Sequence, residues 1–168
     1  MPVTAHDDDD NECRIELVLA READTEALGA ALAGALEPGL KIHLEGDLGA
    51  GKTTLTRAVL RALDFKGSVK SPTYTLIEPY TISRLNLYHF DFYRFTDPDE
   101  FLEAGLDEYF GGDGVCVVEW PGRAAPHLPP PDLRILLRIE GTGRHVEARG
   151  LSPRGQECLR KIREMVNP

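Results

Sequence analysis

Apolar positions in the first third of the chain predict a strand, a helix, a second strand and a second helix. Residues 13–20 (CRIELVLA) alternate between apolar and polar side chains, as a half-buried strand does. In the next segment leucine recurs at every fourth position, which predicts a helix that Asp24 or Thr25 can cap. The apolar run 41–45 (KIHLE) is typical of a short strand, and residues 55–63 have the spacing of a helix with one buried side.

The middle of the chain combines a turn-rich region, a strand and a helix. Residues 66–80 are polar and rich in turn-forming residues, and the alternation that follows predicts a strand ending near Asp91. Asp97 and Glu100 have the spacing of a capping box, with Asp97 as the N-cap. They predict one helix that runs to about Tyr109.

The last third of the chain predicts a buried strand, a hairpin and a closing helix. Residues 115–118 (VCVV) read as a fully buried strand with the acidic Glu119 at its carboxyl end. The runs 133–140 (LRILLRIE) and 144–150 (RHVEARG) flank a glycine-rich turn, which indicates a hairpin. A final helix is expected to begin around Ser152.

Length and composition favour one globular domain. The chain has 168 residues, of which 42% are hydrophobic, and this is enough to bury an ordinary core. We expect residues 13–168 to form a single domain and residues 1–12, with the run Asp7 to Asp10, to be a disordered acidic tail. A net charge of -9 disfavours autonomous binding of DNA or RNA. A partner subunit that binds nucleic acid stays compatible with this charge.

Targeting and cysteine signals point to a cytoplasmic protein. The chain contains no apolar run of membrane-spanning length, and its first residues lack the basic-then-apolar order of a signal peptide. We therefore expect no membrane partner. The three cysteines are far apart and form no C-x-x-C pair, which favours reduced structural thiols over disulfides or a zinc site.

A glycine-rich loop carries the clearest chemical signal. Residues 46–53 (GDLGAGKT) satisfy the pattern G-x-x-x-x-G-K-[ST] between an apolar strand and a helix, the context that the pattern needs. Glycines let successive N–H groups turn towards an anion, and the helix start adds unsatisfied donors. Lys52 can reach the β and γ phosphates, and the Thr53 hydroxyl can bind Mg²⁺. The loop therefore predicts binding of a nucleoside triphosphate.

Two acidic residues close predicted strands and are candidates for the metal side of the site. Acids at the carboxyl ends of parallel strands can hold Mg²⁺ directly or through water. Glu119 follows the more buried strand and is our first candidate. Asp91 could hold a second water, orient Thr53 or act on the attacking water. The pattern does not separate their roles, and each could instead be a solvated strand end.

Three neighbours of these acids leave alternatives open. His89 shares a strand face with Asp91 and could be structural or catalytic, with neither favoured. Arg94 could neutralise phosphate charge, but a salt bridge to Asp91 is the preferred interpretation. Trp120 is expected to pack near the site, and a role in an interface is the second interpretation.

The segment 71–76 (SPTYTL) joins the helix after the glycine loop to the next strand. Nucleotide-sensing loops occupy this place in related architectures, and a hydroxyl that binds metal only with a γ-phosphate present would act as a switch. On composition alone, an ordinary turn containing proline is equally compatible.

Four segments together resemble one family, the bacterial ATPase of tRNA threonylcarbamoyladenosine biosynthesis, the TsaE type. They are GDLGAGKTT (46–54), VKSPTYTLIEPY (69–80), YHFDFYR (88–94) and VEWP (118–121). The loop alone would indicate only a superfamily, whereas the combination is specific. The resemblance implies a P-loop three-layer α/β fold with a small mixed, mainly parallel sheet and a C-terminal hairpin.

The resemblance also implies a function and partners. The family binds ATP and Mg²⁺, hydrolyses ATP slowly alone, and acts with the transferase subunits TsaD and TsaB. That complex installs threonylcarbamoyl on adenosine 37 of tRNAs that read ANN codons, so contact with tRNA would be indirect. The acidic head, residues 1–12, lies outside the matching segments, and nothing about its role follows from them.

Motif by motif, the resemblance assigns roles to residues of this chain. Lys52, Asp91 and Glu119 would be catalytic, and Thr53, Asp91 and Glu119 would hold the metal. Contacts with the nucleotide are implied for Glu22, Thr25, Gly46, Gly49, Ala50, Gly51, Lys52, Thr53, Thr54, Thr73, Thr75, Gly143 and Arg144. The matches at Glu22, Thr25, Gly143 and Arg144 are short.

Other functions compete with this interpretation. A P-loop small-molecule kinase is the main alternative, but it predicts a lid with several arginines, and none is visible in the sequence. A GTPase would carry N-K-x-D, which is absent. A binding module that uses ATP only to set its shape would hydrolyse ATP near the background rate, and it overlaps with the family role.

Overall fold

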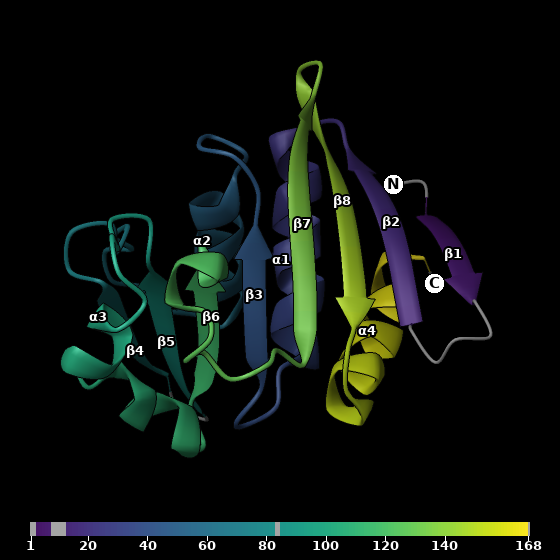
Figure 1. Cartoon of the computed structure of the whole chain (residues 1–168). Coiled ribbons are helices and arrows are strands. Elements are labelled where there is room, and N and C mark those ends of the chain that lie inside the picture. The colour runs from purple at the N-terminus through teal and green to yellow at the C-terminus, as the bar shows by residue number, and fades with distance from the viewer. Residues whose placement is uncertain (1–2, 8–12, 83–84, 168) are drawn as a thin grey trace.

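The computed structural model describes the backbone of residues 3–7 and the residues 13–82 and 85–167 in full. Within these ranges the strands form one eight-stranded sheet, in the order β1-β2-β8-β7-β3-β6-β5-β4 (Figure 1). The strands are β1 (Val3–Asp7), β2 (Cys13–Leu19), β3 (Lys41–Glu45), β4 (Ile77–Ile82), β5 (Leu85–Asp91), β6 (Val115–Glu119), β7 (Leu133–Glu140) and β8 (Gly143–Gly150).

Parallel pairing is confined to the centre of the sheet. The strands β5, β6, β3 and β7 run parallel to their neighbours in this row. The other neighbouring pairs are antiparallel, because the β7–β8 hairpin adds β2 and then β1, and β4 folds back on β5. The predicted mixed α/β fold and its late hairpin are confirmed, although less of the sheet is parallel than expected.

Three helices cover one face of the sheet and enclose the main core. They are α1 (Glu22–Ala35), α2 (Lys52–Ala62) and α4 (Pro153–Val166), and they lie behind the sheet in Figure 1. Inward residues such as Ile15, Ile42 and Ile135 are at most 1% exposed and pack in this core. Burial of this apolar surface, at roughly 25 cal/mol per Å², is the main force that holds the layers together.

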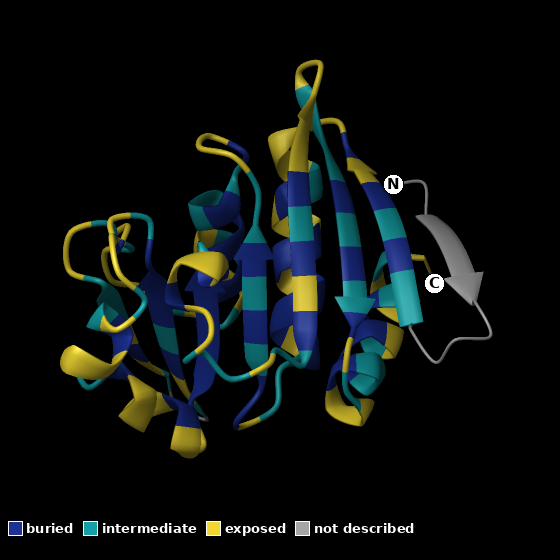
Figure 2. Cartoon of the chain, in the orientation of Figure 1, coloured by how far each residue is buried: buried dark blue, intermediate teal, exposed yellow. Residues whose placement is uncertain are grey.

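Among the described residues, the opposite face is covered over β5, β6 and the start of β4. The short helix α3 (Glu100–Glu103) and the 3₁₀ turns η1 (Leu106–Gly111) and η2 (Pro121–Ala124) close a second core there, rich in phenylalanine. Phe92 and Phe95 stack with their ring centroids 4.7 Å apart. In Figure 2 successive residues of β3, β7 and β8 alternate between buried and more exposed, because every second residue points to this face, over which no described helix lies. The third layer is therefore partial.

Several predicted elements are confirmed, and one long helix is not. The segment after Asp97 forms α3 and then η1 instead of one helix to Tyr109. Gly105 separates the two with a φ of 70°, a left-handed conformation that interrupts an α-helix. Only the Glu100 half of the predicted capping box is present, because Glu100 accepts hydrogen bonds from the backbone N–H groups of Thr96 and Asp97, whereas the N-cap of α3 is Asp99 and not Asp97.

Three further expectations are corrected. Residues 3–7 form the edge strand β1 and not a disordered tail, while 1–2 and 8–12 lie outside the described residues. The first helix begins three or four residues earlier than expected, because Asp24 accepts from the backbone N–H of Arg21 and so caps from inside the first turn. Residues 77–80, the end of the region read as turn-rich, belong to β4, an edge strand in which Pro79 is tolerated.

Two expectations about membranes and cysteines can be compared with the structure. Among the described residues, none of the helices combines the length and the apolar character needed to cross a membrane. All three cysteines are free thiols. Burial raises the pKa of Cys116 to about 11 and that of Cys158 to about 12, which keeps both thiols protonated and unreactive at neutral pH.

Candidate nucleotide and metal site

The glycine loop joins the carboxyl end of β3 to the first turn of α2, and its backbone requires glycine. Gly46 has a φ of 147°, and a Cβ there would lie 2.4 Å from the carbonyl oxygen of Leu137. Gly51, the N-cap of α2, has a φ of 105°. Any L-residue with a side chain would be strained at both positions. The loop therefore holds the open, left-handed turns that bring backbone N–H groups to a helix N-terminus.

Lys52 is folded back onto this loop. Its Nζ donates to the carbonyl oxygen of Gly46 and, at 3.1 Å, to that of Asp47. The residue is only 5% exposed. Desolvation lowers the pKa of Lys52, although the nearby charges of Glu119, Asp91 and Asp47 act in the opposite direction. A bound anion would compensate for this desolvation, so the buried lysine favours a phosphate ligand.

The two candidate acids lie side by side at the same edge of the sheet. Asp91 and Glu119 are partners in the β5–β6 register and are 4% and 3% exposed. Thr53 Oγ1 donates to Glu119 Oε2 at 3.3 Å. Of the three roles left open for Asp91, contact with Thr53 is made in this structure by Glu119 instead.

The segment 71–76 reaches the site through one of its two candidate hydroxyls. Thr73 Oγ1 donates to Asp91 Oδ2 at 3.0 Å, whereas Thr75 Oγ1 donates to Glu78 at 3.1 Å on the surface. The other oxygen of Asp91 accepts from the backbone N–H of Tyr93 at 2.9 Å. The structure thus brings Thr73, and not Thr75, to the acidic pair.

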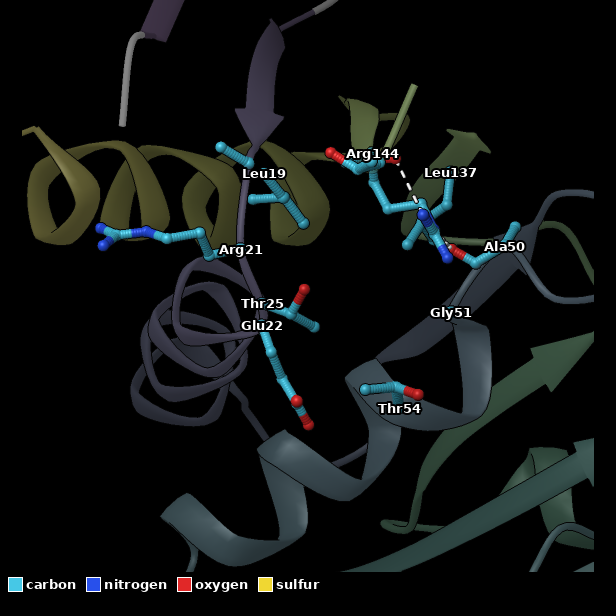
Figure 3. Close-up of a pocket in the computed structure, with 12 residues that line it drawn as sticks. Leu19, Arg21, Glu22, Thr25, Ala50, Gly51, Thr54, Leu137 and Arg144 are labelled. Atoms are coloured by element: carbon cyan, nitrogen blue, oxygen red, sulfur yellow. Dashed lines mark hydrogen bonds between the residues drawn. The ribbon is translucent and has the colours of Figure 1, made fainter. Parts of the chain in front are cut away.

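A pocket of about 330 Å³ opens beside the glycine loop (Figure 3). Glu22 and Thr25 of α1 face Gly51 and Thr54 at the N-terminal end of α2 across it, and the start of β8 closes a further side. The twelve lining residues are Leu19, Ala20, Arg21, Glu22, Thr25, Ala50, Gly51, Thr54, Leu137, Thr142, Gly143 and Arg144. The structure therefore brings Glu22, Thr25, Gly143 and Arg144, which the resemblance had linked to a nucleotide from distant segments, into one pocket beside the loop.

Arg144 connects this pocket to the loop. Its Nε donates to the carbonyl oxygen of Ala50 at 2.8 Å, and its Nη2 donates to that of Gly49 at 3.2 Å. A third hydrogen bond, from Nη1, reaches the carbonyl oxygen of Gly143. The guanidinium therefore acts as a clamp on the loop backbone.

Comparison with known proteins agrees with the order of these segments. Residues 19–147 match the family model described as threonylcarbamoyl adenosine biosynthesis protein TsaE. The chain belongs to the TsaE family.

Individual relatives support this assignment. A tRNA threonylcarbamoyladenosine biosynthesis protein TsaE from Haemophilus influenzae is 43% identical over 111 residues, which is 66% of this chain and 70% of that protein. The protein of the same name from Bacillus subtilis is 45% identical over 118 residues, 70% of this chain and 73% of that one. The crystal structure of Bacillus subtilis YdiB covers 93% of this chain and 98% of its own, with a TM-score of 0.80 and 31% identity.

In this TsaE chain, Trp120 has a contact that the sequence did not indicate. Lys52 Nζ lies 4.5 Å from the centroid of the Trp120 ring, a cation–π distance. Trp120 has a φ of 55°, so the chain turns sharply directly after Glu119. The proximity of Trp120 to an acid suggested packing near the site, but a turn of this kind has no sequence signal in a non-glycine residue.

Arg94 is not placed as the sequence suggested. Its guanidinium lies 4.1 Å from the centroid of the exposed Tyr74 ring. None of the ion pairs among the described residues joins Arg94 to Asp91, so the preferred interpretation as a salt-bridge partner is wrong for this structure. The charge of Asp91 is met by hydroxyl and backbone donors instead.

The donor set fits Mg²⁺ bound together with a nucleotide. Within the described ranges, no group of three or more His, Cys, Asp or Glu side chains forms a metal site made by protein alone. Mg²⁺ usually takes only one or two protein oxygens and completes its shell with water and substrate phosphates. The paired oxygens of Thr53 and Glu119 beside the loop meet this requirement.

Proposed function

We propose that this TsaE-family protein is a Mg²⁺-dependent ATPase that serves in formation of threonylcarbamoyladenosine at position 37 of tRNAs reading ANN codons. The observation that carries this proposal is the contact between Thr53 and Glu119 at the end of the phosphate-type loop. It pairs the loop hydroxyl with a buried carboxylate at the point where a nucleotide-bound cation would lie. The role in tRNA modification is supported by the names of the relatives.

The loop, Lys52 and the pocket residues would each contact a different part of ATP. The N–H groups from Gly49 to Thr53 and the amine of Lys52 would bind the phosphates. Lys52 must leave the carbonyl oxygens that it contacts here, and a phosphate oxygen would take their place as acceptor. The pocket lined by Glu22, Thr25 and Arg144 is large enough to take part of a nucleoside. These positions would bind ATP with its phosphates at the glycine loop and its nucleoside in the neighbouring pocket.

The acidic pair would act at the terminal phosphate. Thr53 and Glu119 would hold the Mg²⁺, which neutralises charge on the β and γ phosphates. Asp91, a buried carboxylate in the neighbouring strand, would take part in the metal's water shell or position the attacking water. The Thr73 hydroxyl, bonded to Asp91 here, would respond to the γ-phosphate and so report the nucleotide state to the surface segment 71–76.

We expect slow hydrolysis by the isolated protein, and the placement of two arginines supports this expectation. Arg144 is engaged by loop carbonyl oxygens, and Arg94 by the ring of Tyr74. With both guanidinium groups engaged in this way, transition-state charge on the phosphate would be left to Lys52 and the metal. A partner would raise the rate, and we propose TsaD–TsaB-type transferase subunits for this part, with tRNA reached through them in the cytoplasm.

Phosphate release with and without the purified transferase pair tests this function. We expect slow release by the protein alone and a clear rise in the complex, because the partner completes the charge stabilisation. Glu119→Ala should remove most of the Mg²⁺-dependent rate while leaving nucleotide binding in EDTA intact. Equal and fast rates with and without the partner would contradict the proposed role, and unchanged Mg²⁺ dependence in the variant would move the metal contact to Asp91.

A further inference from the structure

His89 is a buried polar residue next to the metal-side acids Asp91 and Glu119, and the proposed mode of ATP binding includes no role for it. Its side chain is 0% exposed on β5, and its Nε2 lies 2.5 Å from Glu119 Oε2. In the sheet register His89 pairs with Val117, two residues before Glu119, so both side chains point to the helix-covered face. The contact is therefore built into the pairing of two central strands.

Two donors converge on one oxygen of Glu119. The imidazole Nε2 and the Thr53 hydroxyl both contact Oε2, at 2.5 and 3.3 Å. Among the described residues, no hydrogen bond is made to Oε1. This arrangement restricts rotation of the carboxylate and leaves Oε1 as the oxygen that is available to a metal ion.

The other ring nitrogen argues against a purely packing role. Nδ1 of His89 is buried, and no described residue is its hydrogen-bond partner. A buried polar atom without a partner costs about 1–3 kcal/mol, a cost that leucine at this position would avoid. The contact with Glu119 is the one hydrogen bond of this ring in the described structure, so it is the feature that accounts for an imidazole here.

We propose that His89 is a positioning residue that donates from Nε2 to Glu119 and thereby sets the affinity of the site for Mg²⁺. The inference rests on the proposed Mg²⁺–ATP function and adds to it a residue that touches neither nucleotide nor metal. Such outer partners of metal ligands orient the ligand, and their loss costs about 10- to 100-fold in metal affinity.

Three variants separate positioning from structure. His89→Gln keeps an N–H donor of similar reach, His89→Leu removes the donor but fills the core, and Leu87→Ala is the matched control. Leu87 lies on the same strand and face, is 0% exposed, and contacts neither acid by hydrogen bond in the described structure. The affinity for a non-hydrolysable ATP analogue is measured by calorimetry in EDTA and across a Mg²⁺ titration, with thermal unfolding measured alongside.

We expect His89→Leu to raise the half-saturating Mg²⁺ concentration about tenfold or more, while affinity in EDTA stays within about twofold of wild type. His89→Gln should stay within about threefold of wild type. Leu87→Ala should lower the unfolding temperature and leave the Mg²⁺ dependence unchanged. In nucleotide-free protein, ¹⁵N NMR of histidine side chains should show the His89 proton on Nε2.

Two results would overturn the inference. One is a normal Mg²⁺ dependence in stably folded His89→Leu, and the other is a His89 ring with its proton only on Nδ1. A wild-type protein that binds nucleotide but is indifferent to Mg²⁺ would overturn the proposed function as well, which distinguishes the two failures.

Discussion

The clamp of Arg144 on the glycine loop leads to a quantitative prediction for Arg144→Lys. The guanidinium makes two hydrogen bonds to the carbonyl oxygens of Gly49 and Ala50, and an ammonium on a flexible chain can replace at most one of them well. A hydrogen bond to a charged group contributes about 1.5–3 kcal/mol. If the loop must hold this conformation to bind phosphate, the variant should bind Mg²⁺–ATP about 10- to 100-fold more weakly, at about 1.4 kcal/mol per tenfold.

Calorimetry with two ligands distinguishes the clamp from direct contact with the nucleoside. Inorganic tripolyphosphate has no base or ribose, so a loop effect should weaken it by the same factor as an ATP analogue. The matched control is Arg138→Lys, because Arg138 lies in the same hairpin but on the face over which no described helix lies. Unchanged affinity for both ligands, or a loss confined to the ATP analogue, would refute the clamp.

Two further predictions concern stability. Burial, with a smaller contribution from the charge of Arg134, lowers the pKa of His43 from 6.5 to about 4. As the pH falls from 6.5 to about 4, His43 is therefore protonated in the unfolded state but not in the folded state, and the folded protein loses stability. His43→Val should therefore gain about 2–3 kcal/mol relative to wild type in urea unfolding between pH 7 and pH 4, and a pH-independent difference would contradict this. Gly29→Ala should destabilise by about 1–3 kcal/mol, because the new Cβ would lie 2.4 Å from Ala58 Cβ between α1 and α2. Gly34→Ala in the same helix meets only the flexible Met165 and serves as the control, expected to be neutral or stabilising; equal effects would contradict the packing argument.

Local patterns in the sequence predicted the elements that carry the site. The spacing of apolar residues placed β3, α2 and β5, and a continuous apolar run placed β6, because the apolar residues of each segment pack in one or both of the cores. The loop motif between β3 and α2 needs only local backbone geometry, so its position was also predictable. Glu119 and Asp91 were found because both end a strand at the same edge of the sheet.

Contacts between distant segments could not be predicted in the same way. The cation–π contact of Lys52 depends on the positive φ of Trp120, for which a tryptophan gives no signal. The choice of Glu119 over Asp91 as partner of Thr53 depends on side-chain positions across two strands. The break at Gly105 was missed because the capping signal at Asp97 favours a helix start and does not specify its length.

Reconstituted tRNA modification tests the central claim most directly. Threonylcarbamoyladenosine formation is measured with purified transferase subunits, tRNA, the threonylcarbamoyl donor and ATP, and with wild-type protein, Lys52→Ala protein or no added protein. The account predicts sustained formation with wild type, and with Lys52→Ala no more than without the protein. Formation by Lys52→Ala at the wild-type rate would contradict the claim that ATP use at this loop drives the protein's role.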